Sequence, residues 1–306
     1  MMKITRAQLI LAIVVMSFAM TPEIAQSYEY KNTCTMGAIP IFSAQRMESI
    51  FAPIAAELGT VMDCNLRYQG AVDYKDFMER LKNREYDIAF IQPFDYVRIA
   101  VIQGYVPLAR RNGRLYAVIV TRPKSEIRHL SDLKGKTIAL PPEVAAVTYL
   151  TNVTLANAGL NIPEDVSYLH TKNHGSCMHN VLIGKADACA TAPPTLRMFE
   201  VKNRQKFRVI ARSPSLPHAL FVVRGNMSDE SFQQLQQKLL NISLSNDARR
   251  FFLKDDLMLP FRVVDDNEYD VVREYCKKLT EFQQPEFIKP CQRPTSSGPF
   301  LTQVKQ

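Results

Sequence analysis

The densest group of possible metal ligands lies in one short stretch, in which three histidines surround a cysteine. These residues are His170, His174, Cys177 and His179. Imidazole nitrogens and cysteine thiolates are ligands of zinc and copper, so the stretch supports the hypothesis of a metal site. The alternative is a disulfide between Cys177 and Cys189, which leaves no thiolate to bind a metal. We favour the disulfide and expect neither a metal nor another cofactor.

His174 falls in a loop between a predicted strand and a predicted helix, where binding residues are common. We expect its ring to donate a hydrogen bond to a ligand oxygen, and this role would depend on pH if the ring gains a proton. Further loops of the same kind supply the other candidate ligand contacts, each of which is also explained as a helix cap or a packing residue. These candidates are Ser43, Gln45, Gln92, Tyr96, Glu143, Thr148 and Thr191.

Common catalytic motifs are missing from the sequence. It has no Gly-x-Ser-x-Gly elbow, no Gly-x-x-x-x-Gly-Lys-Ser/Thr phosphate loop and no His-Glu-x-x-His pair. The carboxylate pair Asp265-Asp266 falls in a predicted helical region, where we interpret it as a helix cap. We therefore expect the protein not to be an enzyme.

The elements that must position these residues alternate between strand-like and helix-like segments from Cys34 onward. This order predicts an α/β fold with parallel strands covered by helices. A helix that begins near Ser43, for example, has apolar residues at helical spacing from Met47 to Leu58. The predicted strands are 34–39, 64–68, 87–91, 115–121, 137–140, 166–170, 187–191, 207–211 and 218–224.

Two α/β units emerge, because the second is inserted between the long apolar strands 115–121 and 218–224. Two crossings between lobes make a hinge, and ligands bind beyond the carboxyl ends of strands in such sheets. Helix N-termini at that edge favour anions. The expected parts are a signal peptide (1–27), lobe 1 (28–120 and 217–291), lobe 2 (121–216) and a flexible tail (292–306).

The N-terminal stretch has the three parts of a secretory signal peptide. Lys3 and Arg6 precede an apolar run at 9–16, and Ala25-Gln-Ser27 offers a cleavage site. We therefore expect a periplasmic protein, in which an even number of cysteines favours disulfides. The expected pairs are Cys34–Cys64, Cys177–Cys189 and Cys276–Cys291, although fifteen pairings of six cysteines are formally possible.

The net charge of +8 is compatible with anions, an acidic membrane surface or ordinary surface charge, and we favour the last. Basic residues do not form a block with interleaved aromatic residues, so we expect no nucleic acid as a partner. A monomer is the default for a two-lobed architecture.

Five segments, taken in their order along the chain, resemble a known family. They are Gly37-Ala-Ile-Pro40, Tyr86-Asp-Ile-Ala-Phe90, Asp132-Leu-Lys-Gly-Lys136, Gly184-Lys-Ala-Asp187 and Ser213-Pro-Ser-Leu-Pro217. The chain is similar to the periplasmic binding proteins of phosphate, phosphite and phosphonate transporters. The resemblance implies two lobes, each a mostly parallel sheet flanked by helices, and capture of a small ligand for an inner-membrane ABC permease. The alternative is a sensor that presents the bound ligand to a membrane histidine kinase.

At the expected site the sequence departs from this family, in which a Ser-Thr-Ser-Gly turn holds the oxyanion. The corresponding stretch here is Pro141-Pro-Glu-Val-Ala-Ala-Val147, so Val144, Ala145 and Ala146 replace the hydroxyl residues. His174 matches a family ligand contact, but Ile91 stands in place of a tyrosine and Gly175 in place of an acidic residue. These changes favour a less charged solute, or an anion held mainly by backbone N–H groups.

Overall fold

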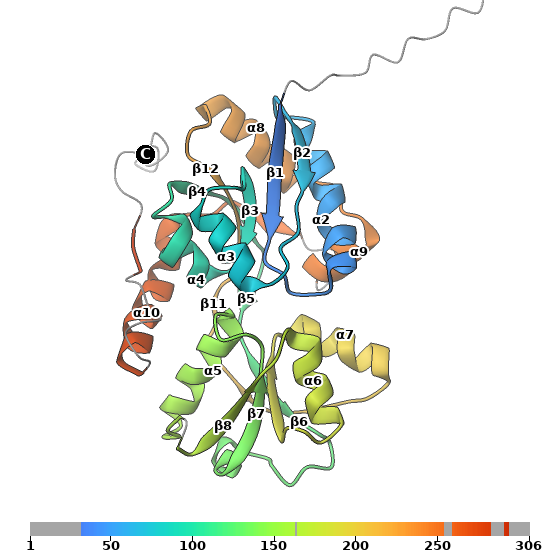
Figure 1. Ribbon diagram of the computed structural model, residues 1–306, viewed down its shortest axis with the longest axis vertical. Helices are drawn as coiled ribbons and strands as arrows, with labels where there is room; N and C mark the ends of the chain where they lie inside the picture. The colour runs from blue at the N-terminus through green and yellow to red at the C-terminus, as the bar shows by residue number, and fades with distance from the viewer. Residues whose placement is uncertain (1–31, 163, 254–258, 283–290, 294–306) are drawn as a thin grey trace, which may run out of the picture. The chain divides into compact units, whose positions relative to one another are not determined.

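The computed structural model describes residues 32–162, 164–253, 259–282 and 291–293 (Figure 1). The expected signal peptide and most of the expected tail, residues 294–306, lie outside these ranges. Within them, no helix combines the length and the apolar character needed to cross a membrane.

The first sheet has the strand order β13-β4-β12-β3-β1-β2. In it β1 runs parallel to β2 and β3, whereas β12 is antiparallel to both β3 and β4. The strands are β1 (Thr33–Ala38), β2 (Asn65–Tyr68), β3 (Ile88–Ile91), β4 (Tyr105–Arg111), β12 (Leu220–Arg224) and β13 (Phe261–Arg262).

Two groups of helices pack around this sheet (Figure 1). One contains α2 (Ala44–Gly59), α8 (Asp229–Leu240) and α9 (Asn246–Phe252), and the other contains α3 (Tyr74–Lys82), α4 (Pro93–Asp95) and the π-helical turn η1 (Tyr96–Ala100). The predicted stripe of α2 is buried at Met47, Ile50, Phe51, Ile54 and Leu58. The last helices of the described ranges are η3 (Asp266–Tyr269) and α10 (Asp270–Phe282), and α10 contacts both α4 and α5.

The second sheet has the strand order β10-β6-β9-β7-β8. Its strands are β6 (Val118–Thr121), β7 (Lys136–Leu140), β8 (Val166–His170), β9 (Ala188–Thr191) and β10 (Arg208–Arg212). Its helices are η2 (Leu130–Leu133), α5 (Ala146–Asn157), α6 (His174–Leu182) and α7 (Pro193–Asn203). Here β7 is parallel to β8 and β9, whereas β6 is antiparallel to β9 and β10.

Both sheets are therefore mixed, which corrects the expectation of mostly parallel sheets. The strand that enters each sheet after a crossing, β6 in the second sheet and β12 in the first, runs antiparallel to its neighbours β9 and β3. The long strand expected at 115–121 is interrupted at 116–117, and the one expected at 218–224 begins only at Leu220. Two short strands lie in the crossing segments: β5 (Arg114–Leu115) falls between β4 and β6, and β11 (Leu216–Pro217) falls between β10 and β12. These two strands pair with each other.

Two aspartates of the family-like segments tie neighbouring strands together at equivalent places in the two sheets. The carboxylate of Asp87, before β3, accepts the N–H of Thr35 in β1 at 2.7 Å. The carboxylate of Asp187, before β9, accepts the N–H of Thr137 in β7 at 2.9 Å. These motif residues therefore align strands.

The predicted disulfides are confirmed. They are Cys34–Cys64, Cys177–Cys189 and Cys276–Cys291. The first joins β1 to the residue before β2, and the second joins α6 to β9. Covalent links of this kind stabilise the fold mainly by restricting the unfolded chain.

Candidate functional site

A cavity of about 370 Å³ is lined by residues of the first sheet, by the starts of the helices α5, α6 and α7, and by the crossing segments. Its volume lies toward the lower end of small-molecule sites, which span roughly 300–1,000 Å³. The polar lining includes Gln92, Arg111, His174, Arg197 and His218. Aromatic and aliphatic side chains form much of the remaining wall, so the cavity combines a few cationic groups with apolar surface.

Arg111 ends β4 and lines the cavity although only 6% of its surface is exposed. Its Nε donates to the carbonyl of Phe252 at 3.2 Å, and its Nη2 donates to the carbonyl of Phe251 at 2.6 Å. The guanidinium also lies 5.0 Å from the centre of the Phe251 ring. These contacts fix the group at the end of a strand without neutralising its charge.

Burial, and then the positive charge of Arg197, lower the pKa of Arg111 to about 10. The guanidinium is therefore still charged at neutral pH. None of the described residues supplies a carboxylate to it. A buried charge without an ionic partner is costly, and the described contacts that offset this cost are two carbonyl oxygens and an aromatic ring.

Two further arginines line the cavity. Arg114 is held by Ser215, whose hydroxyl and carbonyl accept from it at 2.8 and 2.7 Å, and Arg197 projects from α7. Aspartate and glutamate are absent from the described residues of the lining. The described part of the cavity is therefore positively charged, which raises the local concentration of anions.

Two histidines of the lining are held neutral at physiological pH. Burial lowers the pKa of His174 to about 4, and burial together with Arg111 and Arg110 lowers the pKa of His218 well below its usual value. The N–H of Ala219 donates to Nδ1 of His218 at 2.8 Å, so the proton of this neutral ring lies on Nε2. Nε2–H of His218 can then donate to a ligand oxygen.

Gln92 links the end of β3 in the first sheet to the start of α5, which contacts β9 of the second sheet. Its Nε2 donates to the carbonyl of Val144 at 2.6 Å, and its Oε1 accepts the N–H of Ala146 at 2.7 Å. Nε2 also lies 3.1 Å from the carboxylate of Asp95, which is buried. The side chain that follows β3 thus binds the start of α5, at the edge of the cavity.

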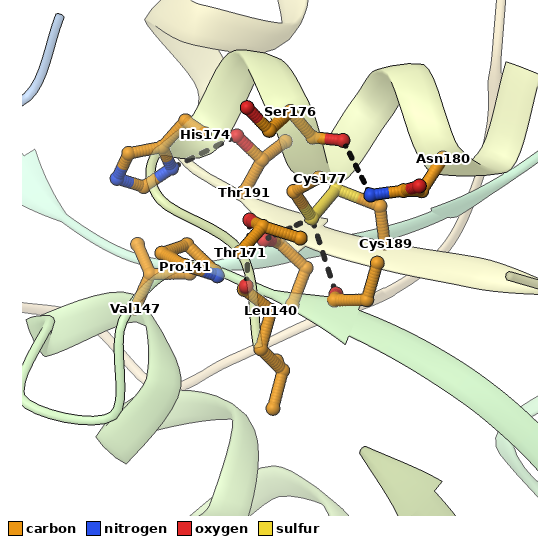
Figure 2. The surroundings of a disulfide bond; sticks show 12 residues. Leu140, Pro141, Val147, Thr171, His174, Ser176, Cys177, Asn180, Cys189 and Thr191 are labelled. Atoms are coloured by element: carbon orange, nitrogen blue, oxygen red, sulfur yellow. Dashed lines mark hydrogen bonds between the residues drawn. A yellow bond between two sulfur atoms is a disulfide. The ribbon is translucent and has the colours of Figure 1, made fainter. Parts of the chain in front are cut away.

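Gln92 and His174 are the two sequence-predicted contacts that line the cavity. Thr191 lies just behind it, with its hydroxyl oxygen 3.1 Å from Nδ1 of His174 (Figure 2). Ser43 stands at the N-cap of α2 without a side-chain cap bond, and Gln45 is exposed in the first turn of that helix. Neither of them belongs to the lining.

The other three predicted contacts also lie outside the lining. Tyr96 is buried and donates its hydroxyl to the carboxylate of Asp266 at 2.7 Å. Thr148 is buried and donates to the carbonyl of Pro142 at 2.9 Å. Glu143 is exposed, with its carboxylate 3.7 Å from Nε2 of His170.

The histidine-rich stretch around Cys177 is organised by the disulfide rather than by a metal-binding cluster (Figure 2). Cys177 is bonded to Cys189, so it carries no thiolate. His170 points to the carbonyl of Pro141 at 3.2 Å, whereas His174 points to Thr191. No group of three or more potential metal ligands occurs in the described ranges.

Sequence reasoning missed Arg111, Arg114, Arg197 and His218. The pair Arg110-Arg111 directly precedes Asn112-Gly113, a strong turn signal, and this combination marks the end of a strand. A basic residue at a strand end beside a crossover was therefore the available signal. The strand contains a proline, and this made the strand hard to predict from the sequence.

A family model described as "ABC transporter, phosphonate, periplasmic substrate-binding protein" matches residues 36–269. Among solved structures, PhnD1 from Prochlorococcus marinus, in complex with methylphosphonate, is similar with a TM-score of 0.70 and 17% identity. That match covers 82% of this chain and 99% of the other.

A binding protein component of an ABC phosphonate transporter from Pseudomonas aeruginosa has a TM-score of 0.68 and 18% identity, with 81% of this chain and 87% of the other covered. A Xanthomonas citri protein bound to chloride has a TM-score of 0.63 and 20% identity, with 82% and 98% covered. At these identities the structures show a shared fold of two α/β lobes with strands crossing between them.

Proposed function

The chain belongs to the periplasmic substrate-binding protein family of phosphonate-type ABC transporters, and from this premise we propose that it captures a small anion in the cavity between its sheets. In this proposal the protein acts in the periplasm as a monomer and delivers the anion to an inner-membrane permease. Members of this family bind solutes and are not enzymes.

Arg111 is the single observation that carries the choice of an anion. It is almost fully buried, it keeps its charge at neutral pH and it has no carboxylate partner among the described residues. A bound anion would supply the missing counter-ion, and a charge-assisted hydrogen bond in a buried site is among the stronger polar contacts. A neutral solute would leave the guanidinium uncompensated.

We propose that the sheets define two lobes, residues 28–120 with 217–291 and residues 121–216, and that they close on the ligand. The Gln92 bridge supports this, because it joins the end of β3 to the start of α5, a helix that contacts β9 of the second sheet. A ligand that contacts both lobes would shift the population toward the closed form. We further propose Gln92 and His174 as cavity residues that contact the ligand or its closest neighbours.

The experiment is a thermal-unfolding screen of the purified protein with anions, neutral solutes and cations at matched ionic strength. An anion at 100 times its dissociation constant should stabilise the fold by about 2.7 kcal/mol. Hits are then titrated by calorimetry against Arg111→Met, for which we expect at least about a tenfold loss of affinity. Stabilisation by neutral solutes alone would contradict the proposal.

Arg208→Met is the matched control. Arg208 is also anchored by two backbone carbonyls, those of Pro123 and Ser125, but it lies outside the cavity lining. This control should bind the anion like the unchanged protein. If Arg111→Met does not fold, Arg111→Lys keeps the charge but shortens the reach, and it should bind more weakly; equal binding by either variant overturns the role of Arg111.

A further inference from the structure

Asp95 carries a buried carboxyl group directly behind the wall of the cavity. Only 1% of its surface is exposed, and it ends the short helix α4, which follows β3. Two residues that interact with it, Gln92 and Tyr74, line the cavity. Gln92 donates to Oδ1 of Asp95 at 3.1 Å, and the charge of Asp95 acts on the hydroxyl of Tyr74. One layer of side chains therefore separates Asp95 from the cavity.

The described contacts give little support to a negative charge on Asp95. Its Oδ2 has no hydrogen-bond partner among the described residues, and its Oδ1 accepts from the neutral amide of Gln92. Arg98 directs Nη1 to the hydroxyl of Tyr149 at 2.7 Å, and its charge lowers the pKa of Asp95 by less than burial raises it. A buried carboxyl group with so few donors gains a proton more easily than an exposed one, because its charge loses hydration.

The titratable groups around Asp95 come from every element that packs on this part of the chain. They are Tyr74 from α3, Arg98 from η1, Tyr149 from α5, and the pair Asp266 and Arg273 from η3 and α10. The last two form an ion pair at 2.6 Å, so their charges offset each other. Both tyrosine hydroxyls keep their protons, because burial raises their pKa values. Asp95 is the member of this set whose charge changes near neutral pH, since burial raises its pKa to about 7.

Contacts between α4 and α5 enclose Asp95. Gln92, the residue before α4, accepts the N–H of Ala146 in α5 at 2.7 Å. The ring of Phe94 packs on that of Tyr149 in α5, with 4.9 Å between the ring centres. Separation of α5 from α4 would break these contacts and admit water to the carboxyl group. Closure of the lobes therefore favours the protonated form of Asp95, and opening favours the ionised form.

We propose that capture of an anion in the cavity is coupled to the uptake of a proton from solvent by Asp95. This inference rests on the proposed function and adds the regulation of that site by pH. A bound anion and an ionised Asp95 repel each other across the layer formed by Gln92 and Tyr74, and protonation removes the repulsion. Closure acts in the same direction because it buries the carboxyl group. Anion affinity therefore falls as pH rises through neutral values.

The first test is calorimetry with methanesulfonate, acetate and methylphosphonate at pH 6 and pH 8.5 and matched ionic strength. His174 stays neutral and Arg111 stays charged over this range, so neither changes its charge. For the unchanged protein we expect affinity on the order of five- to tenfold weaker at pH 8.5. Asp95→Asn should abolish this difference, and the exposed Asp63→Asn should keep it. Protons exchanged by the ligand itself are common to all three proteins and cancel.

The second test counts protons in the unchanged protein, so it does not depend on the folding of a variant. Titration of methanesulfonate at pH 7.5, in two buffers with different heats of ionisation, gives the number of protons taken up on binding. Methanesulfonate has no titratable group in this range. We expect uptake of a fraction of a proton, and we expect none with Asp95→Asn.

The outcomes separate this inference from the proposed function. Proton uptake and a pH-dependent affinity that both disappear in Asp95→Asn support the coupling. Anions that bind without proton uptake, or with a pH dependence that persists in Asp95→Asn, overturn the coupling but leave anion capture in place. If none of the three anions binds the folded protein at either pH, both proposals are wrong.

Discussion

The hydroxyl oxygen of Thr191 lies 3.1 Å from Nδ1 of His174, and both side chains are buried (Figure 2). Thr191 ends β9, whereas His174 begins α6. The contact fixes the orientation of the imidazole ring and turns its other nitrogen, Nε2, away from Thr191. A residue at the end of a sheet strand thus positions a ring that lines the cavity.

Removal of this hydroxyl should affect both stability and binding. We expect Thr191→Val to destabilise the fold by about 1–2 kcal/mol, because Nδ1 of His174 is left buried without a partner. Binding of any anion identified by the thermal screen should weaken several-fold as the ring loses its orientation. Urea unfolding and calorimetry measure the two effects.

Thr191→Ser is the control for this prediction, since it keeps the hydroxyl and loses a methyl group. It should bind the anion like the unchanged protein. If Thr191→Val loses stability but binds as before, the ring of His174 is not part of ligand binding and the contact with Thr191 is purely structural.

Asp95 gives a second prediction, on the dependence of stability on pH. Burial raises the pKa of Asp95 from 3.8 to about 7, against the opposing effects of Gln92 and Arg98. Two tyrosines also interact with the carboxyl of Asp95: Tyr74 from α3 and Tyr149 from α5. The carboxyl is therefore protonated in the folded protein at mildly acidic pH.

From pH 3.8 to about 7 the unfolded chain releases this proton while the folded protein keeps it, so the contribution of Asp95 to stability falls as pH rises. Above about pH 7 the free-energy cost of burying the ionised carboxylate of Asp95 is constant, on the order of 4 kcal/mol. Asp95→Asn removes it and keeps an oxygen that can accept from Gln92. The variant should gain stability relative to the unchanged protein as pH increases.

Urea unfolding at pH 5 and pH 8 checks this difference, with the exposed Asp63→Asn as the control. The acid-side loss of stability due to His174, whose pKa is lowered to about 4, is common to both proteins and cancels in the comparison. A gain for Asp95→Asn that is the same at both pH values would show that Asp95 is ionised throughout.

The sequence predicted elements whose periodicity is local and a ligand site beyond the strand ends, but it did not identify the arginines that line the cavity. The stripe of α2 and the alternation of strands and helices are visible in short windows, and the structure has both. Arg111 was missed because β4 contains Pro107, which is unusual in a strand interior. Arg110, the residue before Arg111, is also atypical of a buried strand. Its guanidinium forms an ion pair with the carboxylate of Glu268 at 2.9 Å, which stabilises it there.

Contacts between distant segments explain the other differences. Tyr96 was expected in the cleft because it follows the third predicted strand. Its hydroxyl instead binds Asp266, which is 170 residues away in the sequence. Thr148 is likewise used within its own segment, where it holds the carbonyl of Pro142. No local pattern distinguishes such partners from ligand contacts.

Arg197 supports a prediction about anion affinity, because it lines the cavity from α7 and its charge lowers the pKa of Arg111 on β4. The two like charges, one on α7 and one on β4, repel each other, and an anion bound between them would remove this repulsion. We expect Arg197→Gln to weaken anion binding roughly 5–20-fold and to make the dissociation constant less sensitive to salt. Calorimetry at two salt concentrations measures both effects.

Lys202→Gln is the matched control, since it removes one positive charge from an exposed position of the same helix. It is not part of the cavity lining. A loss of affinity as large as that of Arg197→Gln would mean that the general charge of α7, rather than a direct contact of Arg197, attracts the anion.

Two of the disulfides, Cys177–Cys189 and Cys34–Cys64, are predicted to differ in their effect on binding. Cys177–Cys189 closes a separation of 12 residues and joins α6, which carries His174, to β9, which carries Thr191. Cys34–Cys64 closes a separation of 30 residues and lies outside the cavity lining. Loop-closure entropy gives about 3 kcal/mol for the first link and about 4 kcal/mol for the second.

Replacement of both cysteines of a pair by alanine separates stability from binding. Cys34→Ala with Cys64→Ala should cost more stability in urea unfolding, yet leave the affinity of the folded protein for its anion unchanged. Cys177→Ala with Cys189→Ala should cost less stability but weaken binding, because α6 and β9 can then shift and misalign His174. Equal affinities for the two double variants would show that strand and helix packing alone holds the histidine in place.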